Sequence, residues 1–388
     1  MGVESFDQKN IELAALDLEA KKDHWERKSG YYSEKINEFG LKTIDRFADY
    51  YPEPNQLIKS RVVFAHRDLE NIATAIDEKK PWAVISGINP SGPLHFGHKL
   101  VFDELLWLQK QGADVYIPIT NDESYIVDKT KTLEESRKIA YDAVIPSIVA
   151  MGFNPEKTHI FVDSDYPDIY NVAMQLSKHI SLNRIYGVFG FGKDEDKENP
   201  GTLFYRGAVQ LAQILLPQYE EFGGPVPTLI PVGVDQYPYV LLSRDIARKT
   251  KLIPPSALFL KFQHGLDGKG KMSTTRKESA IFLNDNPNDV QKKIKGAYTG
   301  GSVSATYQKE HGGVPGVCPI NHLRTYHFEK DDRVEQQCSN GEILCGECKR
   351  CALEQVGDFL ADHQAKLPEA RKNTENYLLR TKITSFLK

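Results

Sequence analysis

The stretch that decides how this chain is organised is Trp82-Ala83-Val84-Ile85-Ser86-Gly87-Ile88-Asn89-Pro90-Ser91-Gly92-Pro93-Leu94-His95-Phe96-Gly97-His98. It begins with a short apolar run followed by glycines and prolines, which is typical of a buried strand and the turn after it. Residues 99–111 then place leucines and a phenylalanine at helical spacing. The turn is therefore predicted to lie at the carboxyl end of a parallel strand, where open α/β sheets bind ligands.

The same alternation of strand and helix recurs along the chain. Further strands are predicted at 115–120, 158–162 and 227–233, and helices at 133–151 and 240–251. This order indicates an α/β fold with a parallel sheet covered by helices. Pro118 predicts an irregularity in its strand because proline cannot donate to a ladder.

Changes of composition suggest the domain boundaries. We expect a polar helical extension over 1–75, a Rossmann-type domain over 76–290 that is interrupted at about 163–224, and a helical domain over 291–388. Within the interruption, residues 192–201 are rich in glycine and charge and look mobile.

Composition fits a globular protein without disulfides. The chain has 388 residues, 40% hydrophobic and 26% charged, and no apolar run near the ~20 residues that a membrane helix needs. The polar N-terminus lacks the apolar core of a secretory signal, so we expect a cytoplasmic protein without a membrane partner. The net charge of −4 by itself does not indicate a polyanionic partner. The lysines near 292–295 and 366–388 are predicted to form solvent-exposed faces of helices.

His95 and His98 are candidate phosphate ligands. They are three residues apart at the start of a helix, so they share a face beside the free N–H groups of the helix end. Gly87 would let the backbone approach a ligand closely. The alternatives are two structural histidines or a metal site, although no carboxylate accompanies the pair.

A second candidate is the loop Gly265-Leu266-Asp267-Gly268-Lys269-Gly270-Lys271-Met272-Ser273. It nearly fits the phosphate-binding pattern G-x-x-x-x-G-K-[ST], but Met272 stands where a hydroxyl should bind metal. We expect a mobile loop whose Lys271 stabilises charge on a leaving pyrophosphate, with a solvated surface loop as the alternative.

The His-Phe-Gly-His turn and the Lys-Met-Ser loop together resemble the paired signatures of class I aminoacyl-tRNA synthetases. Further segments resemble the archaeal and eukaryotic tryptophanyl branch over roughly residues 35–365. These segments are 64–69, 234–239, 243–247, 300–301, 312–313 and 339–344.

The resemblance implies ATP-dependent activation of an amino acid and its transfer to tRNA, with Mg²⁺ on the phosphates. The catalytic residues would be His95, His98 and Lys271. The nucleotide-binding residues would be Gly87, Asn89, Ser91, Gly97, Met272 and Ser273. The resemblance also implies an anticodon-binding C-terminal domain and a homodimer with its contact around 165–220.

Amino-acid recognition departs from the family pattern. By resemblance, Glu123 and Gln236 would bind the substrate ammonium group. Ile85 and Pro118 stand where the branch usually has a tyrosine and a glutamine that meet the indole N–H. Gln213, near the position of an aspartate in tyrosyl enzymes, could serve the indole instead. Two alternatives stay open: a paralogue that charges tyrosine or a modified amino acid, and a homologue that binds RNA without catalysis.

All five cysteines lie between residues 318 and 351, at 318, 338, 345, 348 and 351. Such clustering in a cytoplasmic protein favours a four-thiolate metal site over structural disulfides. Both zinc and a [4Fe–4S] cluster fit four cysteines. A subset of tryptophanyl synthetases carries a cluster on a similar pattern with a longer first gap. The ligands would be Cys318, Cys338, Cys345 and Cys348, with Cys351 spare.

Overall fold

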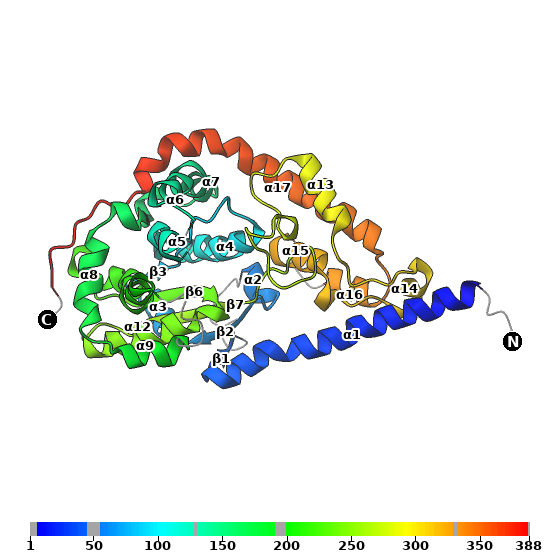
Figure 1. The fold of residues 1–388 in the computed structure, drawn as a ribbon, viewed down its shortest axis with the longest axis horizontal. Coiled ribbons are helices and arrows are strands. Elements are labelled where there is room, and N and C mark those ends of the chain that lie inside the picture. The colour runs from blue at the N-terminus through cyan, green and yellow to red at the C-terminus, as the bar shows by residue number, and fades with distance from the viewer. Residues whose placement is uncertain (1–5, 45–54, 128–129, 191–198, 329–332, 387–388) are drawn as a thin grey trace. The chain divides into compact units, whose positions relative to one another are not determined.

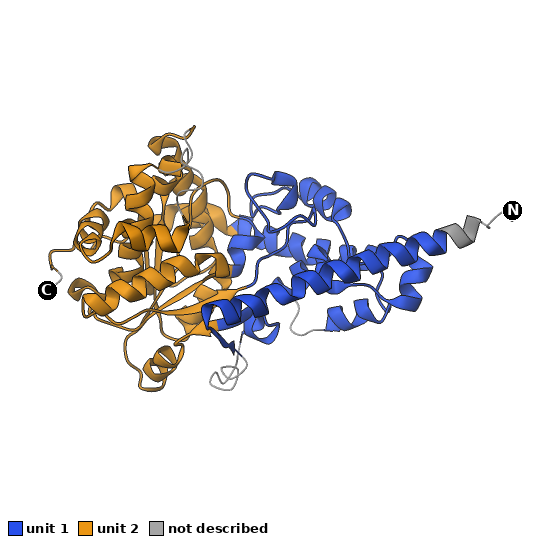
Figure 2. Cartoon of the chain, turned by 60° about the horizontal axis from the view of Figure 1, so that its bottom comes forward, with its two compact units in different colours: residues 1–65, 95–100, 261–365 blue, residues 66–94, 101–260, 366–388 orange. Residues whose placement is uncertain are grey.

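The computed structural model describes residues 6–44, 55–127, 130–190, 199–328 and 333–386. The chain forms two compact units, each built from separate stretches of sequence (Figure 2). The first comprises residues 1–65, 95–100 and 261–365, and the second comprises 66–94, 101–260 and 366–388. The three domains predicted from composition follow chain order, whereas these units do not.

The second unit contains five parallel strands in the order β7-β6-β3-β4-β5. Their bounds are β3 Ala83–Ile85, β4 Asp114–Ile119, β5 Thr158–Val162, β6 Thr228–Gly233 and β7 Ser256–Leu260. The side chains are almost all buried, as expected for a parallel sheet covered on both faces. The predicted α/β class is confirmed, and four of these strands fall where apolar runs predicted them.

Helices flank these strands; in Figure 1, α5 and α6 lie on one side and α9 and α12 on the other. The helices of this unit are α3 Glu70–Asp77, α5 Asn121–Val127, α6 Leu133–Ile139, α7 Ile145–Ala150, α8 Asp168–Ser177, α9 Leu182–Phe189, α10 Pro200–Phe204, α11 Gln210–Leu215 and α12 Tyr237–Lys249. The helix predicted over 133–151 is divided by a π-helical turn at Ala140–Val144. Most of the predicted mobile stretch 192–201 lies outside the described residues.

Pro118 sits inside β4 without interrupting it, contrary to the predicted irregularity. It pairs with Phe161 of β5, while β3 already ends at Ile85, opposite Tyr116. No β3 residue therefore stands beside Pro118 to need its missing N–H.

The first unit is mainly helical. Its elements are α1 Phe6–Phe39, β1 Lys42–Thr43, α2 Gln56–Lys59, α13 Pro287–Gly296, α14 Ala305–His311, α15 Pro319–His327 and α16 Arg333–Ser339. Three elements have residues in both units: β2 Val63–Arg67, α4 Phe96–Lys110 and α17 Cys345–Asn373. The strands β1 and β2 also lie within residues 1–75, for which a helical extension was predicted.

The long helix α1 is fixed to its unit by a few side chains. Leu18 forms a small core with Val314 and Val317, and Nζ of Lys21 donates to the carbonyl of Gly301 at 2.6 Å. Most of the remaining α1 side chains are exposed, so these contacts rather than a wide apolar face hold the helix.

Candidate active site

Two histidines at the start of α4 lie with their rings stacked. The ring centroids of His95 and His98 are 3.8 Å apart and their planes differ by 17°. Nδ1 of His98 accepts the N–H of His95 at 3.2 Å, and Nδ1 of His95 accepts that of Gly97 at 3.1 Å. Because each Nδ1 is an acceptor, each neutral ring carries its proton on Nε2, where it can be donated to a ligand.

This geometry corrects one expectation about the turn. The N–H groups of His95 and Gly97 bond the imidazoles, and that of Phe96 donates to the carbonyl of Ile281 at 3.1 Å. These backbone donors of the helix end are therefore occupied. The Nε2 groups of the two imidazole rings are the donors that this turn leaves for a ligand.

Both imidazoles are neutral near pH 7. Burial lowers the pKa of His95 to about 4, and the nearby charge of Lys271 lowers that pKa as well. For His98, burial, then His95 and Lys271, hold the pKa well below its usual value. The histidines thus supply hydrogen-bond donors, and Lys271 supplies the positive charge.

Close packing joins the histidine turn to the loop that carries Lys271. A Cβ at Gly97 would lie 2.9 Å from Cε1 of His95 and 3.6 Å from Cβ of Met272. Met272 is buried, and its N–H donates to the carbonyl of Gln263 at 2.9 Å. The His95 ring therefore leaves no room for a side chain at Gly97, while Met272 lies at ordinary van der Waals distance from this turn.

The Lys271 loop is held by its own polar contacts. Arg276 pairs with Asp267 at 2.8 Å and also donates to the carbonyl of Lys271 at 2.8 Å. The N–H of Ser273 donates to Oγ of Ser279 at 3.3 Å. These contacts hold the loop backbone in the conformation described, and the Lys271 side chain is exposed.

In the second unit, the predicted site residues follow the carboxyl ends of the strands. Asn89 follows β3, Glu123 follows β4 and Gln236 follows β6. Oε2 of Glu123 accepts from Oγ1 of Thr120 at 3.0 Å and from Nδ2 of Asn89 at 3.3 Å. Because β3 separates β4 from β6, these residues stand at the topological switch point of the sheet.

Glu123 is a buried carboxyl beside a second acid. Burial raises the pKa of Glu123, and the charge of Asp122 raises that pKa further, whereas bonds from Asn89 and Thr120 act in the opposite direction. The positive charge of Arg206 also lowers this pKa but is the last of the causes, so burial prevails, and a cationic ligand would stabilise the charged carboxylate.

A carboxyl pair that sequence reasoning missed lies next to Glu123. Asp163 is fully buried and accepts a hydrogen bond from Nε2 of Gln213, and Asp122 accepts one from the hydroxyl of Tyr170 at 3.0 Å. Burial, followed by Asp122, raises the pKa of Asp163 well above its usual value, so one proton is shared between the two acids. The signal in the sequence was an acid directly after β5.

Gln213, predicted as a contact to the substrate side chain, uses its amide N–H₂ on Asp163. By contrast, Oε1 of Gln210 and Oδ1 of Asn89 are buried and have no hydrogen-bond partner among the described residues. Gln210 was not predicted, and it is a better candidate for meeting a substrate donor.

The departures from the family pattern lie close together. Ile85 is 2% exposed at the end of β3. A Cβ at Gly87 would lie 2.9 Å from Cγ of Pro118, so a glycine is needed here for the chain to pass this proline. Of the other predicted residues, Ser91 accepts Nζ of Lys131 on its carbonyl at 3.4 Å, and Gln236 is half-buried at the start of α12.

Four cysteines of the first unit line a single small cavity. They are Cys318, Cys338, Cys345 and Cys348. Burial, followed by the other three thiols, raises the pKa of Cys338 to about 12, which reflects how close the four lie. Arg324 donates to Sγ of Cys348 at 3.4 Å. Cys351 does not line this cavity.

The cavity itself is about 10 Å³, room for about one water molecule. In the described parts of the chain, no three His, Cys, Asp or Glu side chains lie close enough to hold a metal ion. The donor set thus fits a thiolate site in chemistry, whereas the thiols would have to turn or part to admit an ion or a cluster.

The family model of "tRNA synthetases class I (W and Y)" matches residues 77–361. The chain belongs to this family. A tryptophan–tRNA ligase of Methanocaldococcus jannaschii is 37% identical over 88% of this chain and 93% of its own length. A tryptophan–tRNA ligase of Pyrobaculum calidifontis is also 37% identical, over 91% of this chain and 96% of its own length.

The solved structures agree with this class I assignment. The crystal structure of tryptophanyl-tRNA synthetase from Aeropyrum pernix K1 has a TM-score of 0.82 at 33% identity, over 89% of this chain and 96% of that one. As a class I synthetase, the chain has its signature histidines and lysine grouped in the first unit, and its strand-end polar residues in the second. No helix of the described residues is long and apolar enough to cross a membrane.

Proposed function

We propose that this protein is a tryptophan–tRNA ligase, which activates tryptophan with ATP and transfers it to tRNA. The observation that carries the chemistry is the stacked, neutral His95–His98 pair in the field of Lys271. The relatives that match nearly the whole chain carry the substrate assignment.

In the first step, an oxygen of the tryptophan carboxylate attacks the α-phosphorus of ATP and pyrophosphate leaves. The substrate supplies the nucleophile, so the protein contributes position and electrostatics. His95 and His98 donate through Nε2 to phosphate oxygens, and Lys271 stabilises the charge that develops on the pyrophosphate. Mg²⁺ bound to ATP would share that charge.

The amino acid is held in the second unit. Glu123 is the counter-charge of the substrate ammonium group, and Gln236 is a second acceptor. Ile85 and Pro118 offer no side-chain acceptor to an indole N–H, and a buried unpaired donor costs ~1–3 kcal/mol. Oε1 of Gln210 is the acceptor we assign to this role, because it is buried and has no partner among the described residues.

The function is tested by ATP–pyrophosphate exchange against a panel of amino acids, followed by aminoacylation of tRNA. We expect exchange with tryptophan and charging of tRNA(Trp). Exchange with tyrosine or another amino acid instead would identify a paralogue. Absence of exchange with every amino acid would identify a non-catalytic RNA-binding homologue.

We also propose that Cys318, Cys338, Cys345 and Cys348 hold a [4Fe–4S] cluster, with Zn²⁺ as the alternative. Support comes from the four thiols that line one cavity and from the four-cysteine donor set, which is that of an iron–sulfur cluster. Arg324, which donates to Cys348, would then hydrogen-bond a bound thiolate.

Metal analysis of anaerobically purified protein tests the cluster. We expect iron and acid-labile sulfide in equal amounts, with broad visible absorbance that Cys338→Ala abolishes and Cys351→Ala retains. A colourless sample with about one zinc per chain would replace the cluster by zinc, and a sample without metal would remove both.

The remaining inferences rest on the family. We propose a homodimer with its contact around 165–220, an anticodon-binding role for residues 291–388, and a cytoplasmic location, where tRNA is charged. Analytical ultracentrifugation tests the first, since a monomer at micromolar concentration would contradict it.

A further inference from the structure

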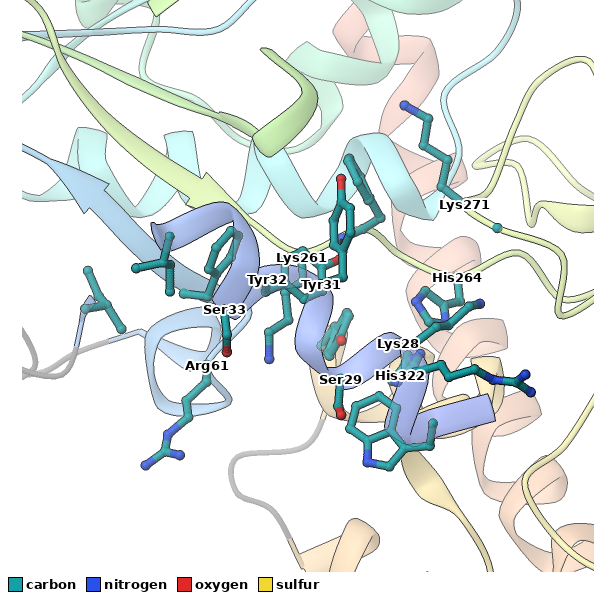
Figure 3. A pocket seen from close by; sticks show the side chains of 18 of the residues that line it. Lys28, Ser29, Tyr31, Tyr32, Ser33, Arg61, Lys261, His264, Lys271 and His322 are labelled. Atoms are coloured by element: carbon teal, nitrogen blue, oxygen red, sulfur yellow. Dashed lines mark hydrogen bonds between the residues drawn. The ribbon is translucent and has the colours of Figure 1, made fainter. Parts of the chain in front are cut away.

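A cavity of about 520 Å³ lies within the first unit, apart from the cysteine cavity (Figure 3). Its walls come from the middle of α1, the segments around 61–64 and 261–271, and α15. The volume falls in the range of small-molecule sites, ~300–1,000 Å³.

The charged residues that line this cavity are all cations: Arg27, Lys28, Arg61, Lys261 and Lys271. Among the described lining residues there is no aspartate or glutamate. Burial is the main cause that lowers the pKa of His264 in the same wall to about 4, and the charge of Lys28 lowers that pKa further. A cleft lined by one sign of charge attracts a ligand of the opposite sign.

Flat aromatic rings line the same cavity. They are Trp25, Tyr31, Tyr32, Phe64, Phe262 and Tyr326. The rings of Trp25 and Tyr31 are 39% and 37% exposed, unusually open for such residues. Trp25 is fixed on one side, because a Cβ at Gly316 would lie 2.5 Å from its ring. Tyr32 is fixed by the N–H of Phe262, which donates to its hydroxyl at 3.1 Å.

One polar atom in this wall is deeply buried. His322 is 4% exposed, and its Nδ1 makes no well-formed hydrogen bond with a described residue, although the backbone of Gly316 lies near the ring. Its ring is held between His264, at 4.4 Å in an edge contact, and Tyr326, stacked at 5.1 Å. A buried polar nitrogen in a fixed ring is suited to a ligand that brings its own hydrogen-bonding group.

We propose that this cavity binds a nucleotide unit other than the ATP substrate, with its phosphate on the cations other than Lys271, which serves the pyrophosphate, and its base against the exposed rings. Because the described lining has cationic side chains and no carboxylate, it favours a phosphate group. The exposed aromatic rings can stack on an unpaired base. The proposal deepens the proposed function, since tRNA is its polynucleotide substrate. The same chemistry could come from a free nucleotide or from an unpaired nucleotide of tRNA.

The double variant Lys28→Ala/Arg61→Ala tests the phosphate contacts, and Lys22→Ala, an exposed lysine of α1 outside the cavity, is its control. Binding is measured with fluorescently labelled tRNA and, separately, with cytidine monophosphate by calorimetry. We expect the double variant to bind about 10-fold more weakly or worse, with the slope of log K against log salt reduced by about 1.4. The Lys22→Ala variant should bind like the unmodified protein.

A second pair of variants tests base stacking. Tyr31→Ala should weaken binding by about 5- to 100-fold, and Tyr31→Phe, which keeps the ring, should restore it. Circular dichroism and thermal unfolding establish that each variant folds.

Losses confined to tRNA identify the source as tRNA, and losses confined to cytidine monophosphate identify a free nucleotide; both support the site. Unchanged affinity for both ligands in the folded double variant and in Tyr31→Ala overturns it. If the unmodified protein shows no pyrophosphate exchange while the variants still lose binding, the proposed function falls and this site stands.

Discussion

Replacing Lys271 by alanine should lower the turnover of ATP–pyrophosphate exchange by about 10²–10³-fold, the usual effect of removing one donor to a developing charge. The KM for tryptophan should change little, because the amino acid is held by residues of the other unit. Turnover should fall because Lys271 brings a positive side-chain charge to the pyrophosphate, whereas His95 and His98 are neutral.

Lys269→Ala is the matched control, since Lys269 is an exposed neighbour in the same loop. The backbone N–H of Lys269 donates to Oδ1 of Asp267 at 3.0 Å, and this hydrogen bond does not depend on the lysine side chain. A loss in Lys269→Ala as large as that in Lys271→Ala would mean that the loop acts by bulk charge. Normal turnover of Lys271→Ala would remove the lysine from the mechanism.

Glu123→Gln should raise the KM for tryptophan by about 10- to 100-fold, because the substrate ammonium group loses a charged hydrogen-bond partner. The KM for tryptophan should also depend on pH. Burial raises the pKa of Glu123 above its usual value, so the carboxyl becomes neutral as pH falls through that raised pKa. Tryptophan keeps its ammonium charge over this range, so the KM should fall as pH rises and then level off.

The KM of the Glu123→Gln variant should not change with pH in this way, because glutamine does not titrate. Glu134→Gln, at an exposed position of α6, is the control and should retain both the KM and its pH profile. If the unmodified protein keeps one KM from pH 5 to pH 8 and Glu123→Gln matches it, another group binds the ammonium.

The parallel strands could be predicted because burial on both faces leaves short apolar runs that few other elements produce. β2 could not be predicted in the same way. Its sequence, Val63–Arg67, ends in His66 and Arg67 and follows a polar stretch, so nothing in its periodicity distinguishes it from the surroundings.

The residues of the site could be predicted from the sequence, but the hydrogen bonds between them could not. Spacing predicted that His95 and His98 share a helix face, but it could not reveal that their Nδ1 atoms bond the backbone. Similarly, the spacing of the cysteines predicted a cluster of thiols, while the size of the cavity depends on side-chain rotamers. The shared proton of Asp122 and Asp163 depends on burial, which a single sequence does not encode position by position.

The division of the chain into interleaved units has a consequence for how the protein is made. Residues 95–100 belong to a unit whose other stretches are 1–65 and 261–365, and the Phe96 N–H bonds the carbonyl of Ile281. The signature histidines can reach their final geometry only after the ribosome has added nearly two hundred further residues. Contacts at such long sequence separation slow folding and favour intermediates. Truncation at any single point would also leave one unit incomplete, so neither unit can be excised as a contiguous fragment.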